Sequence, residues 1–212
     1  MNKSLLFSLS LFIGLSVAST GCSNSSNTRT KIITDPSAKP VLKIVEKNGM
    51  KLYMDRPMKM KGEEIYFMIS ESLNEALISG CLNAFEYIES IVPLTFKMVD
   101  RKRKNSSFIL LDQKEINEEG LVNGVTNYKS SASTIHDATI DFNSMVRFST
   151  EPKSNEVDAE STCLHELGHA LGLVHVDEPE AVMNAEIELG KIKRRFTEVE
   201  ILRLQTLYPV KD

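Results

Sequence analysis

Hydrophobic and polar positions along the chain fall into short blocks, and the spacing within these blocks changes from strand-like to helix-like. Residues 65–69 form an apolar run of β-branched and aromatic side chains, which predicts a strand buried on both faces. Apolar residues then recur at helical spacing over residues 73–88, after the capping-box pair Ser72 and Glu75 and before Pro93. The pattern therefore predicts a strand followed by a long helix that packs on a sheet.

Shorter apolar segments follow this helix, and their composition indicates further strands. We expect strands at residues 94–99, 107–111, 122–128 and 138–142, with a loop at residues 112–123 and a turn at residues 129–134. Gly124 and two asparagines weaken the segment 122–128, which is interpreted as an edge strand. The basic turn at residues 101–105 is expected to be a solvated loop and not a binding patch.

Two more helices are predicted in the C-terminal part of the chain. The first begins near residues 157–159 and carries a histidine-rich motif. A polar, basic loop at residues 186–196 follows. The second helix starts at a capping box formed by Thr197 and Glu200 and ends at the Tyr-Pro pair of residues 208–209.

The N-terminus has the features of an export signal. Lys3 precedes an apolar run at residues 5–17 that is too short to span a bilayer comfortably, which predicts a signal peptide at residues 1–21. The segment before Cys22 resembles a bacterial lipoprotein processing site, although Ser19 stands where an apolar residue is usual. Cleavage there would leave Cys22 as an acylated N-terminus that anchors the protein to a membrane.

Ordinary secretory cleavage near Ala18 or Gly21 is the alternative, and it would leave a free cysteine. An acylated protein would lie at the cell envelope or surface, whereas an unmodified one would be periplasmic or secreted. Residues 22–45 are largely polar and are expected to form a flexible tether. Residues 46–212 then remain for one folded domain.

Composition limits the classes of function. The chain has 212 residues, 42% of them hydrophobic and 25% charged, which suits a single globular domain. Its formal net charge of −4 argues against a general nucleic-acid binder. If Cys22 is acylated, Cys81 and Cys163 remain, and in an oxidising compartment they could form a disulfide. Two buried free thiols on separate helices are the other possibility.

The histidine-rich motif, HELGHALGLVH at residues 165–175, carries the chemistry of the chain. His165 and His169 are four residues apart, so both imidazoles lie on one face of a helix and can reach a single metal ion. Gly172 can take the left-handed conformation that ends a helix and lets His175 turn back towards that ion. Three imidazoles leave one tetrahedral position open, as in a catalytic zinc site. Sequences of this composition match the five specified positions by chance roughly once in 10⁵, so incidental histidines are set aside.

Several segments together carry a resemblance to a known family. The HExxHxxGxxH signature is matched at residues 165–175, residues 181–184 (AVMN) resemble a Met-turn, and residues 92–96 and 196–209 resemble the flanking elements. On these residues the chain resembles the matrixin (matrix-metalloproteinase-like) family of the metzincin zinc metalloproteases, in a bacterial lipoprotein form. It departs from the family at Asn184, where matrixins usually carry tyrosine, so no tyrosine is assigned to transition-state stabilisation.

The resemblance implies an α+β fold, a zincin-like (metzincin) catalytic domain. Its expected parts are a twisted mixed β-sheet with two long helices, an active-site helix, a Met-turn and a C-terminal helix. The resemblance also implies one catalytic zinc ion held by His165, His169 and His175. Glu166 is then the general base, and Met183 forms an apolar floor beneath the metal without binding it.

Two features of the family comparison concern further ligands and specificity. The segment that carries a second zinc and calcium in animal matrixins is not recognisable, and only His136 and Asp137 lie in that region. We therefore predict no second zinc and leave calcium undetermined. Basic residues in the loop at residues 185–196 are compatible with acidic substrate residues, and equally with a solvated surface.

The implied activity is that of a zinc-dependent endopeptidase acting on a protein or peptide. Glu166 would take a proton from the attacking water and pass it to the leaving amine, while the substrate adds to the edge strand at residues 122–128. The alternative is a catalytically silent surface lipoprotein that binds peptide or protein through the same cleft. That module would need the histidines but not Glu166, so the carboxylate favours an enzyme. A hydrolase of non-peptide amides is disfavoured by the Met-turn, and we expect a monomer with no nucleic-acid partner.

Overall fold

The computed structural model describes residues 43–47, 50–54, 58–116 and 122–210. The predicted signal peptide, Cys22 and most of the predicted tether lie outside the described residues. Strand β1 (Lys43–Lys47) contains the last three residues of the expected tether and forms an antiparallel hairpin with β2 (Met50–Met54). No helix within the described ranges is long and apolar enough to cross a membrane.

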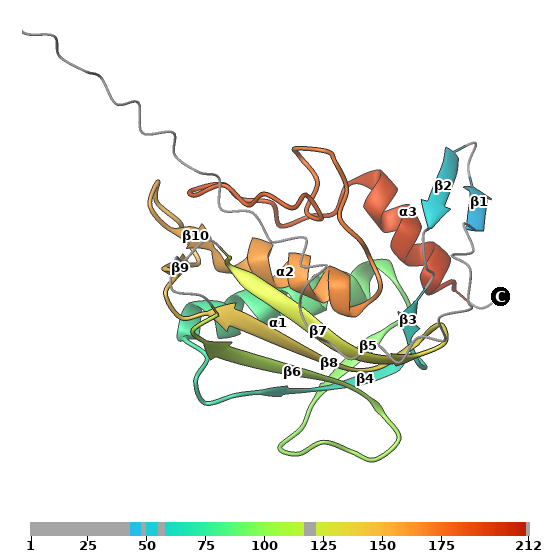
Figure 1. Ribbon diagram of the computed structural model, residues 1–212, viewed down its shortest axis with the longest axis horizontal. Coiled ribbons are helices and arrows are strands. Elements are labelled where there is room, and N and C mark those ends of the chain that lie inside the picture. Colours follow the sequence, from blue (N-terminus) through green and yellow to red (C-terminus); the bar gives the residue numbers. More distant parts are fainter. Residues whose placement is uncertain (1–42, 48–49, 55–57, 117–121, 211–212) are drawn as a thin grey trace, which may run out of the picture.

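A six-stranded mixed sheet forms the centre of the domain (Figure 1). Its strands are β3 (Lys59–Met60), β4 (Glu64–Ile69), β5 (Thr95–Met98), β6 (Ser107–Lys114), β7 (Gly124–Ser131) and β8 (Thr134–Asn143). The order is β3-β8-β6-β4-β5, and β7 pairs antiparallel with β8 while the other pairs are parallel. The β7 strand therefore lies at the edge of the sheet, as predicted for residues 122–128.

Helices α1 (Glu75–Ile91) and α2 (Ala159–Ala170) lie side by side on one face of this sheet (Figure 1). Their apolar faces and the facing strand residues form the buried core, which includes Leu77, Phe85, Ile109, Ile140 and Leu164. A disulfide between Cys81 and Cys163, whose Cα atoms are 5.2 Å apart, joins the two helices. Of the two possibilities for these cysteines, the structure has the paired form.

The start of α1 differs from the predicted capping box. Asn74 is the N-cap, and its side-chain oxygen accepts a hydrogen bond from the backbone N of Leu77 at 2.9 Å. Ser72 instead donates its hydroxyl to Asp112 Oδ1 at 2.6 Å, which ties the β4–α1 connection to β6. Glu75 is then the first helical residue. The prediction of Ser72 as the cap was wrong because a carboxylate on the neighbouring strand engages its hydroxyl.

Two strands extend further than their apolar residues predict. The β6 strand continues to Lys114, into the segment expected to be a loop. The β7–β8 ladder runs to the pair Ser131 and Thr134, so the expected turn at residues 129–134 shrinks to two residues. One of these, Ala132, has a φ of 51°, in the left-handed region that tight hairpins use. Backbone pairing and polar side-chain contacts, such as Lys114 with Asp141 and Ser131 with His136, hold these strand ends, which is why hydrophobic periodicity does not mark them.

The C-terminal elements connect the sheet to the histidine motif. Short strands β9 (Phe148–Ser149) and β10 (Val157–Asp158) pair in parallel, and β10 leads directly into α2. The last helix, α3 (Glu198–Leu207), begins with the predicted capping box of Thr197 and Glu200. Next to its end, the buried Tyr208 hydroxyl donates to Leu171 O at 3.0 Å and accepts from Met60 N at 2.8 Å. The ends of α2 and α3 and strand β3 thus meet at one side chain.

Candidate metal centre

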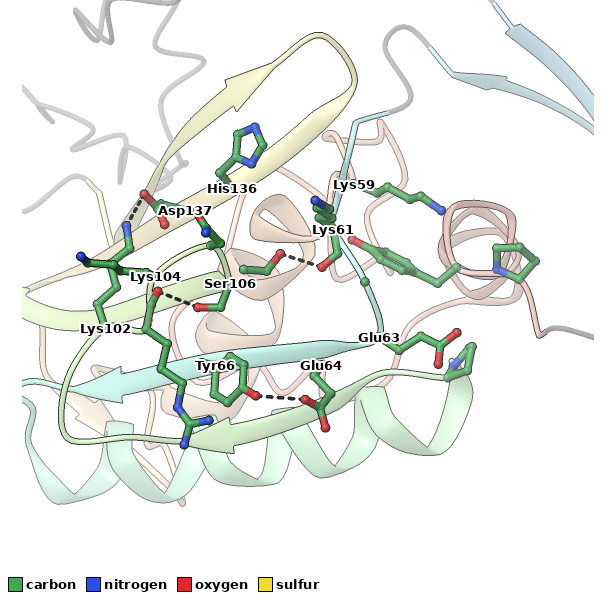
Figure 2. Close-up of a pocket in the computed structure, with 17 residues that line it drawn as sticks. Lys59, Lys61, Glu63, Glu64, Tyr66, Lys102, Lys104, Ser106, His136 and Asp137 are labelled. Atoms are coloured by element: carbon green, nitrogen blue, oxygen red, sulfur yellow. Dashed lines mark hydrogen bonds and ion pairs between the residues drawn. The ribbon is translucent and has the colours of Figure 1, made fainter.

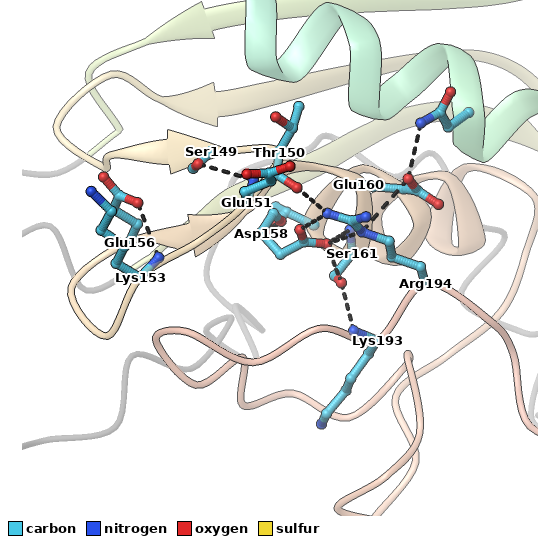
Figure 3. A network of polar contacts seen from close by, with 12 residues as sticks. Ser149, Thr150, Glu151, Lys153, Glu156, Asp158, Glu160, Ser161, Lys193 and Arg194 are labelled. Atoms are coloured by element: carbon cyan, nitrogen blue, oxygen red, sulfur yellow. Dashed lines mark hydrogen bonds and ion pairs between the residues drawn. The ribbon is translucent and has the colours of Figure 1, made fainter.

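A buried acidic cap fixes the N-terminus of α2. Asp158 Oδ2 accepts hydrogen bonds from the backbone N and the hydroxyl of Ser161, at 2.8 and 2.6 Å. Arg194 forms an ion pair with the same carboxylate and donates from Nε to Oδ2 at 3.0 Å (Figure 3). This contact raises the pKa of the Arg194 guanidinium. The helix that carries the motif is therefore fixed to the loop after the Met-turn.

The C-terminus of α2 ends as the sequence predicts, at Gly172. Leu173 N donates to Gly168 O at 2.8 Å and Gly172 N donates to His169 O at 3.0 Å, the two hydrogen bonds of a Schellman motif. Gly172 has a φ of +101°, and a Cβ there would lie 1.8 Å from Met58 O. Glycine is thus required both by the backbone conformation and by the close approach of another segment. The chain leaves the helix at this turn and brings the third histidine back.

Three histidine side chains converge beside this turn. The Nε2 atoms of His165, His169 and His175 lie 3.0–3.2 Å from one another. On the opposite side of the rings, His165 Nδ1 lies 2.7 Å from Val182 O and His169 Nδ1 lies 3.0 Å from Leu173 O. A carbonyl oxygen only accepts, so both Nδ1 atoms carry the hydrogen and both Nε2 atoms present lone pairs. The structure therefore brings the three predicted ligands together around one point.

Burial favours the neutral form of these imidazoles. Desolvation lowers the pKa of His169 to about 4, and it also lowers the pKa values of His165 and His175. Neutral nitrogens at this spacing repel through their lone pairs unless a cation lies between them. Zinc–imidazole bonds of about 2.0–2.1 Å in tetrahedral geometry set ligand nitrogens about 3.3 Å apart, close to the observed spacing. The donor set fits one zinc ion.

The Met-turn packs against α2 next to the histidines. Met183 is 1% exposed, and its Sδ would lie 2.4 Å from a Cβ placed on Gly168, so a larger residue there would displace it. Asn184, at the position of the usual tyrosine, closes the turn: its backbone N donates to Ala181 O at 3.3 Å and its side-chain amide donates to Val176 O at 3.5 Å. Asn184 therefore has a structural contact of its own.

Glu200 links the Met-turn to α3. This buried carboxylate accepts from Met183 N at 2.6 Å, from Thr197 N at 2.7 Å and from the Thr197 hydroxyl at 2.9 Å. The capping box with Thr197 was predicted, whereas the hydrogen bond to Met183 was not. Nothing in the spacing of residues 183 and 200 indicates that they meet.

Glu166, the predicted general base, lies on α2 between the two helical histidines and is 1% exposed. Its side chain faces β7, where Thr126 Oγ1 lies 2.6 Å from Glu166 Oε2. A Cβ placed on Gly124 would lie 3.0 Å from Glu166 Oε1. Sequence reasoning missed both contacts because β7 was expected only to receive the substrate backbone.

Three of the four basic residues of the loop after the Met-turn contact other parts of the protein, whereas Lys191 is exposed and lies 4.0 Å from the exposed Glu188. Lys193 Nζ donates to Pro179 O, Arg194 is paired with Asp158, and the Arg195 guanidinium lies 4.6 Å from the centre of the Tyr87 ring. A cavity of about 440 Å³ beside His175 is lined by the carboxylates Asp177, Glu186 and Glu188 together with Lys193. The structure therefore favours a structural role for the basic residues over the recognition of acidic substrate residues.

A larger cavity of about 1300 Å³ is lined by none of the three motif histidines but by several basic side chains, among them Lys59, Lys61, Lys102 and Lys104 (Figure 2). His136 and Asp137 also line it. Asp137 Oδ2 lies 2.5 Å from Lys102 Nζ, and His136 Nε2 lies 2.6 Å from Ser131 Oγ. Within the described ranges, the three motif histidines are the one group of three His, Cys, Asp or Glu side chains arranged to hold an ion. The absence of a second zinc stays a prediction.

Comparison with known proteins adds one match. The family model described as Matrixin matches residues 64–209, which run from β4 through α3 and include the three histidines, Glu166 and the Met-turn. A search of curated proteins found no match to the chain.

Proposed function

Since the chain belongs to the matrixin family, which in general comprises zinc metalloendopeptidases, we propose that it hydrolyses peptide bonds in proteins or peptides. In this proposal His165, His169 and His175 hold one zinc ion, Glu166 is the general base, and Met183 is the apolar floor of the site. The observation that carries the proposal is the convergence of three Nε2 atoms within 3.2 Å of one another. A carboxylate on the same helix accompanies them.

Zinc bound at this site would lower the pKa of a water molecule to roughly 7 and polarise the scissile carbonyl. The side chains of the protein supply orientation and proton transfer. The carbonyl oxygens of Val182 and Leu173 hold the rings of His165 and His169 in the tautomer that binds a metal. The Glu166 carboxylate accepts a proton from the attacking water and passes it to the leaving amine nitrogen.

The substrate would bind as an extended strand along the outer edge of β7. Among the strands that the structure describes, β7 pairs with β8 alone, so a peptide can add to its other edge. The β7 strand also contacts α2 next to the histidines. A peptide on this edge would therefore run past the three Nε2 atoms.

A peptide library incubated with the purified protein tests the proposal. We expect cleavage that a zinc chelator abolishes and added zinc restores. We expect no enrichment of acidic residues near the scissile bond, because Lys193, Arg194 and Arg195 contact other parts of the protein. Peptides that bind the zinc-loaded protein and are never cleaved would contradict the proposal. That result would favour the silent binding lipoprotein instead.

We also propose that the protein is exported and anchored through Cys22, with residues 1–21 removed and residues 22–45 tethering the domain at residues 46–212. The support is the order of a positive residue, an apolar run and small residues before Cys22. Mass spectrometry of the mature N-terminal peptide is expected to find a diacylglyceryl group on Cys22 in the membrane fraction. An unmodified N-terminus after Ala18 or Gly21 in a soluble fraction would favour ordinary secretion.

A further inference from the structure

The edge strand β7 packs directly on the Glu166 side chain. Gly124 and Thr126 are two residues apart and therefore lie on the same face of β7, the face that packs against α2. A Cβ on Gly124 would lie 3.0 Å from both Cγ and Oε1 of Glu166, so the strand packs closely on the carboxylate at a residue without a side chain. Thr126 Oγ1 lies 2.6 Å from Glu166 Oε2 and 3.0 Å from Glu166 O.

The Thr126 hydroxyl has one hydrogen and two acceptors on Glu166 within reach. The backbone carbonyl of Glu166 lies inside α2, where helix geometry gives it a donor four residues further on. The carboxylate oxygen is closer and carries charge, which makes it the stronger acceptor. The hydroxyl hydrogen is therefore directed to Oε2.

We infer that Thr126 is a positioning residue for Glu166, an inference that rests on the proposed function. The last torsion of a glutamate side chain has broad minima, so the carboxylate plane is poorly defined by the helix alone. A hydrogen bond to one oxygen, with the Gly124 backbone against the other, fixes that plane. General-base catalysis depends on this orientation, because the water must lie within hydrogen-bond reach of the accepting oxygen.

The same strand then serves both partners of the reaction. Its outer edge binds the peptide backbone, and Gly124 and Thr126 on its α2-facing side orient Glu166, which takes a proton from the attacking water. The scissile bond and the Glu166 carboxylate are thereby placed relative to each other by one short piece of backbone, residues 124–126. This arrangement predicts that loss of the Thr126 hydroxyl affects turnover and leaves peptide binding intact.

Thr126→Val removes the hydroxyl and keeps the shape, and Thr126→Ser restores the hydroxyl. Thr139→Val is the matched control, because Thr139 lies on β8 between the buried Ala138 and Ile140 and therefore points to the other face of the sheet. With zinc-loaded protein and a peptide that the wild type cleaves, we expect kcat of Thr126→Val to fall roughly 10- to 100-fold. KM and zinc content should stay unchanged, and Thr126→Ser and Thr139→Val should keep wild-type kcat within about threefold.

Wild-type kcat in Thr126→Val overturns the inference, and so does an equal loss in Thr126→Ser. A loss that appears only in KM or in zinc content also overturns it, because a purely structural contact would act there. If Thr126→Val does not fold, Thr126→Ala gives the same comparison with Thr126→Ser. Failure of the wild type to cleave any peptide contradicts the proposed function itself, whereas an active wild type with an active Thr126→Val contradicts the positioning role alone.

Discussion

Glu200→Gln is expected to loosen the turn beside the histidines without changing the surface of the protein. The Glu200 carboxylate is 1% exposed and accepts three hydrogen bonds, from Met183 N at 2.6 Å, Thr197 N at 2.7 Å and the Thr197 hydroxyl at 2.9 Å. Glutamine keeps one accepting oxygen and replaces the other with an NH₂ group, which only donates. In either orientation of the amide, its NH₂ group therefore lies against a donor, which is Met183 N in one orientation and Thr197 N in the other.

The magnitude follows from the two orientations. If the amide oxygen stays with Met183, the two hydrogen bonds that Thr197 donates to the side chain are lost, which is half of the capping box and costs about 0.5–2 kcal/mol. If the oxygen stays with Thr197, the buried N–H of Met183 is left unpaired, which costs about 1–3 kcal/mol. Loss of the charge weakens the remaining hydrogen bond by about 1 kcal/mol. The two orientations therefore cost about 1.5–3 and about 2–4 kcal/mol, and because the amide takes the less costly one, we expect the free energy of unfolding to fall by about 1.5–3 kcal/mol.

Chemical denaturation of the zinc-loaded protein measures this change, and Glu198→Gln is the control. Glu198 is exposed and also lies in the first turn of α3, so its replacement removes the same charge from the same helix end. We expect Glu198→Gln to change the free energy of unfolding by less than about 0.5 kcal/mol. Zinc affinity should fall in Glu200→Gln only, because Val182, which orients His165, belongs to the same turn. Equal denaturation midpoints for wild type and Glu200→Gln would refute the reasoning.

Three further perturbations have defined outcomes. Gly172→Ala is expected to lower the free energy of unfolding by about 2 kcal/mol or more, and with it the thermal midpoint, because the φ is +101° and the new Cβ would lie 1.8 Å from Met58 O. An unchanged thermal midpoint contradicts this. Replacing Cys81 and Cys163 by alanine is expected to cost about 4 kcal/mol in denaturant unfolding, from the loop entropy of an 82-residue separation, and an unchanged midpoint would show that the crosslink is not formed. In metal-free protein, folding lowers the pKa of His169 from about 6.5 to about 4. Between these two pH values the ring is protonated in the unfolded chain and neutral in the folded protein, so a falling pH favours unfolding. The stability that His169 contributes is then present above pH 6.5 and should fall by about 2 kcal/mol towards pH 4, after allowance for the partial exposure of the ring. His169→Gln should make the profile shallower without flattening it, because His165 and His175 also have lowered pKa values.

Local patterns predicted the centre of the site well. The helical spacing of His165 and His169, the left-handed turn at Gly172 and the capping box at Thr197 each depend on residues within one or two helical turns, so the sequence states them directly. Five of the six strands of the sheet were found for the same reason, because alternating or continuous apolar runs mark buried faces, whereas the two-residue strand β3 was not predicted. Their polar ends were missed where backbone pairing continues without apolar side chains.

Long-range polar contacts could not be predicted in this way. The pairs Arg194–Asp158, Glu200–Met183 and Thr126–Glu166 join segments that are 36, 17 and 40 residues apart. Each uses a residue type that is common on protein surfaces, and its partner is defined only when the helices and the sheet pack. Ser72 shows that a long-range contact can also override a local pattern, because its hydroxyl donates to Asp112 on a neighbouring strand and does not cap the helix.

Zinc content and peptide cleavage measured on one sample of Glu166→Gln test the proposed centre most directly, with Glu180→Gln as an exposed control. The variant should retain one zinc ion per chain through the three histidines and lose turnover by roughly 10²- to 10⁴-fold, the usual contribution of a general base. The control should match the wild type in both measurements. Cleavage by Glu166→Gln at the wild-type rate, or a wild-type protein that binds no zinc, would contradict the account.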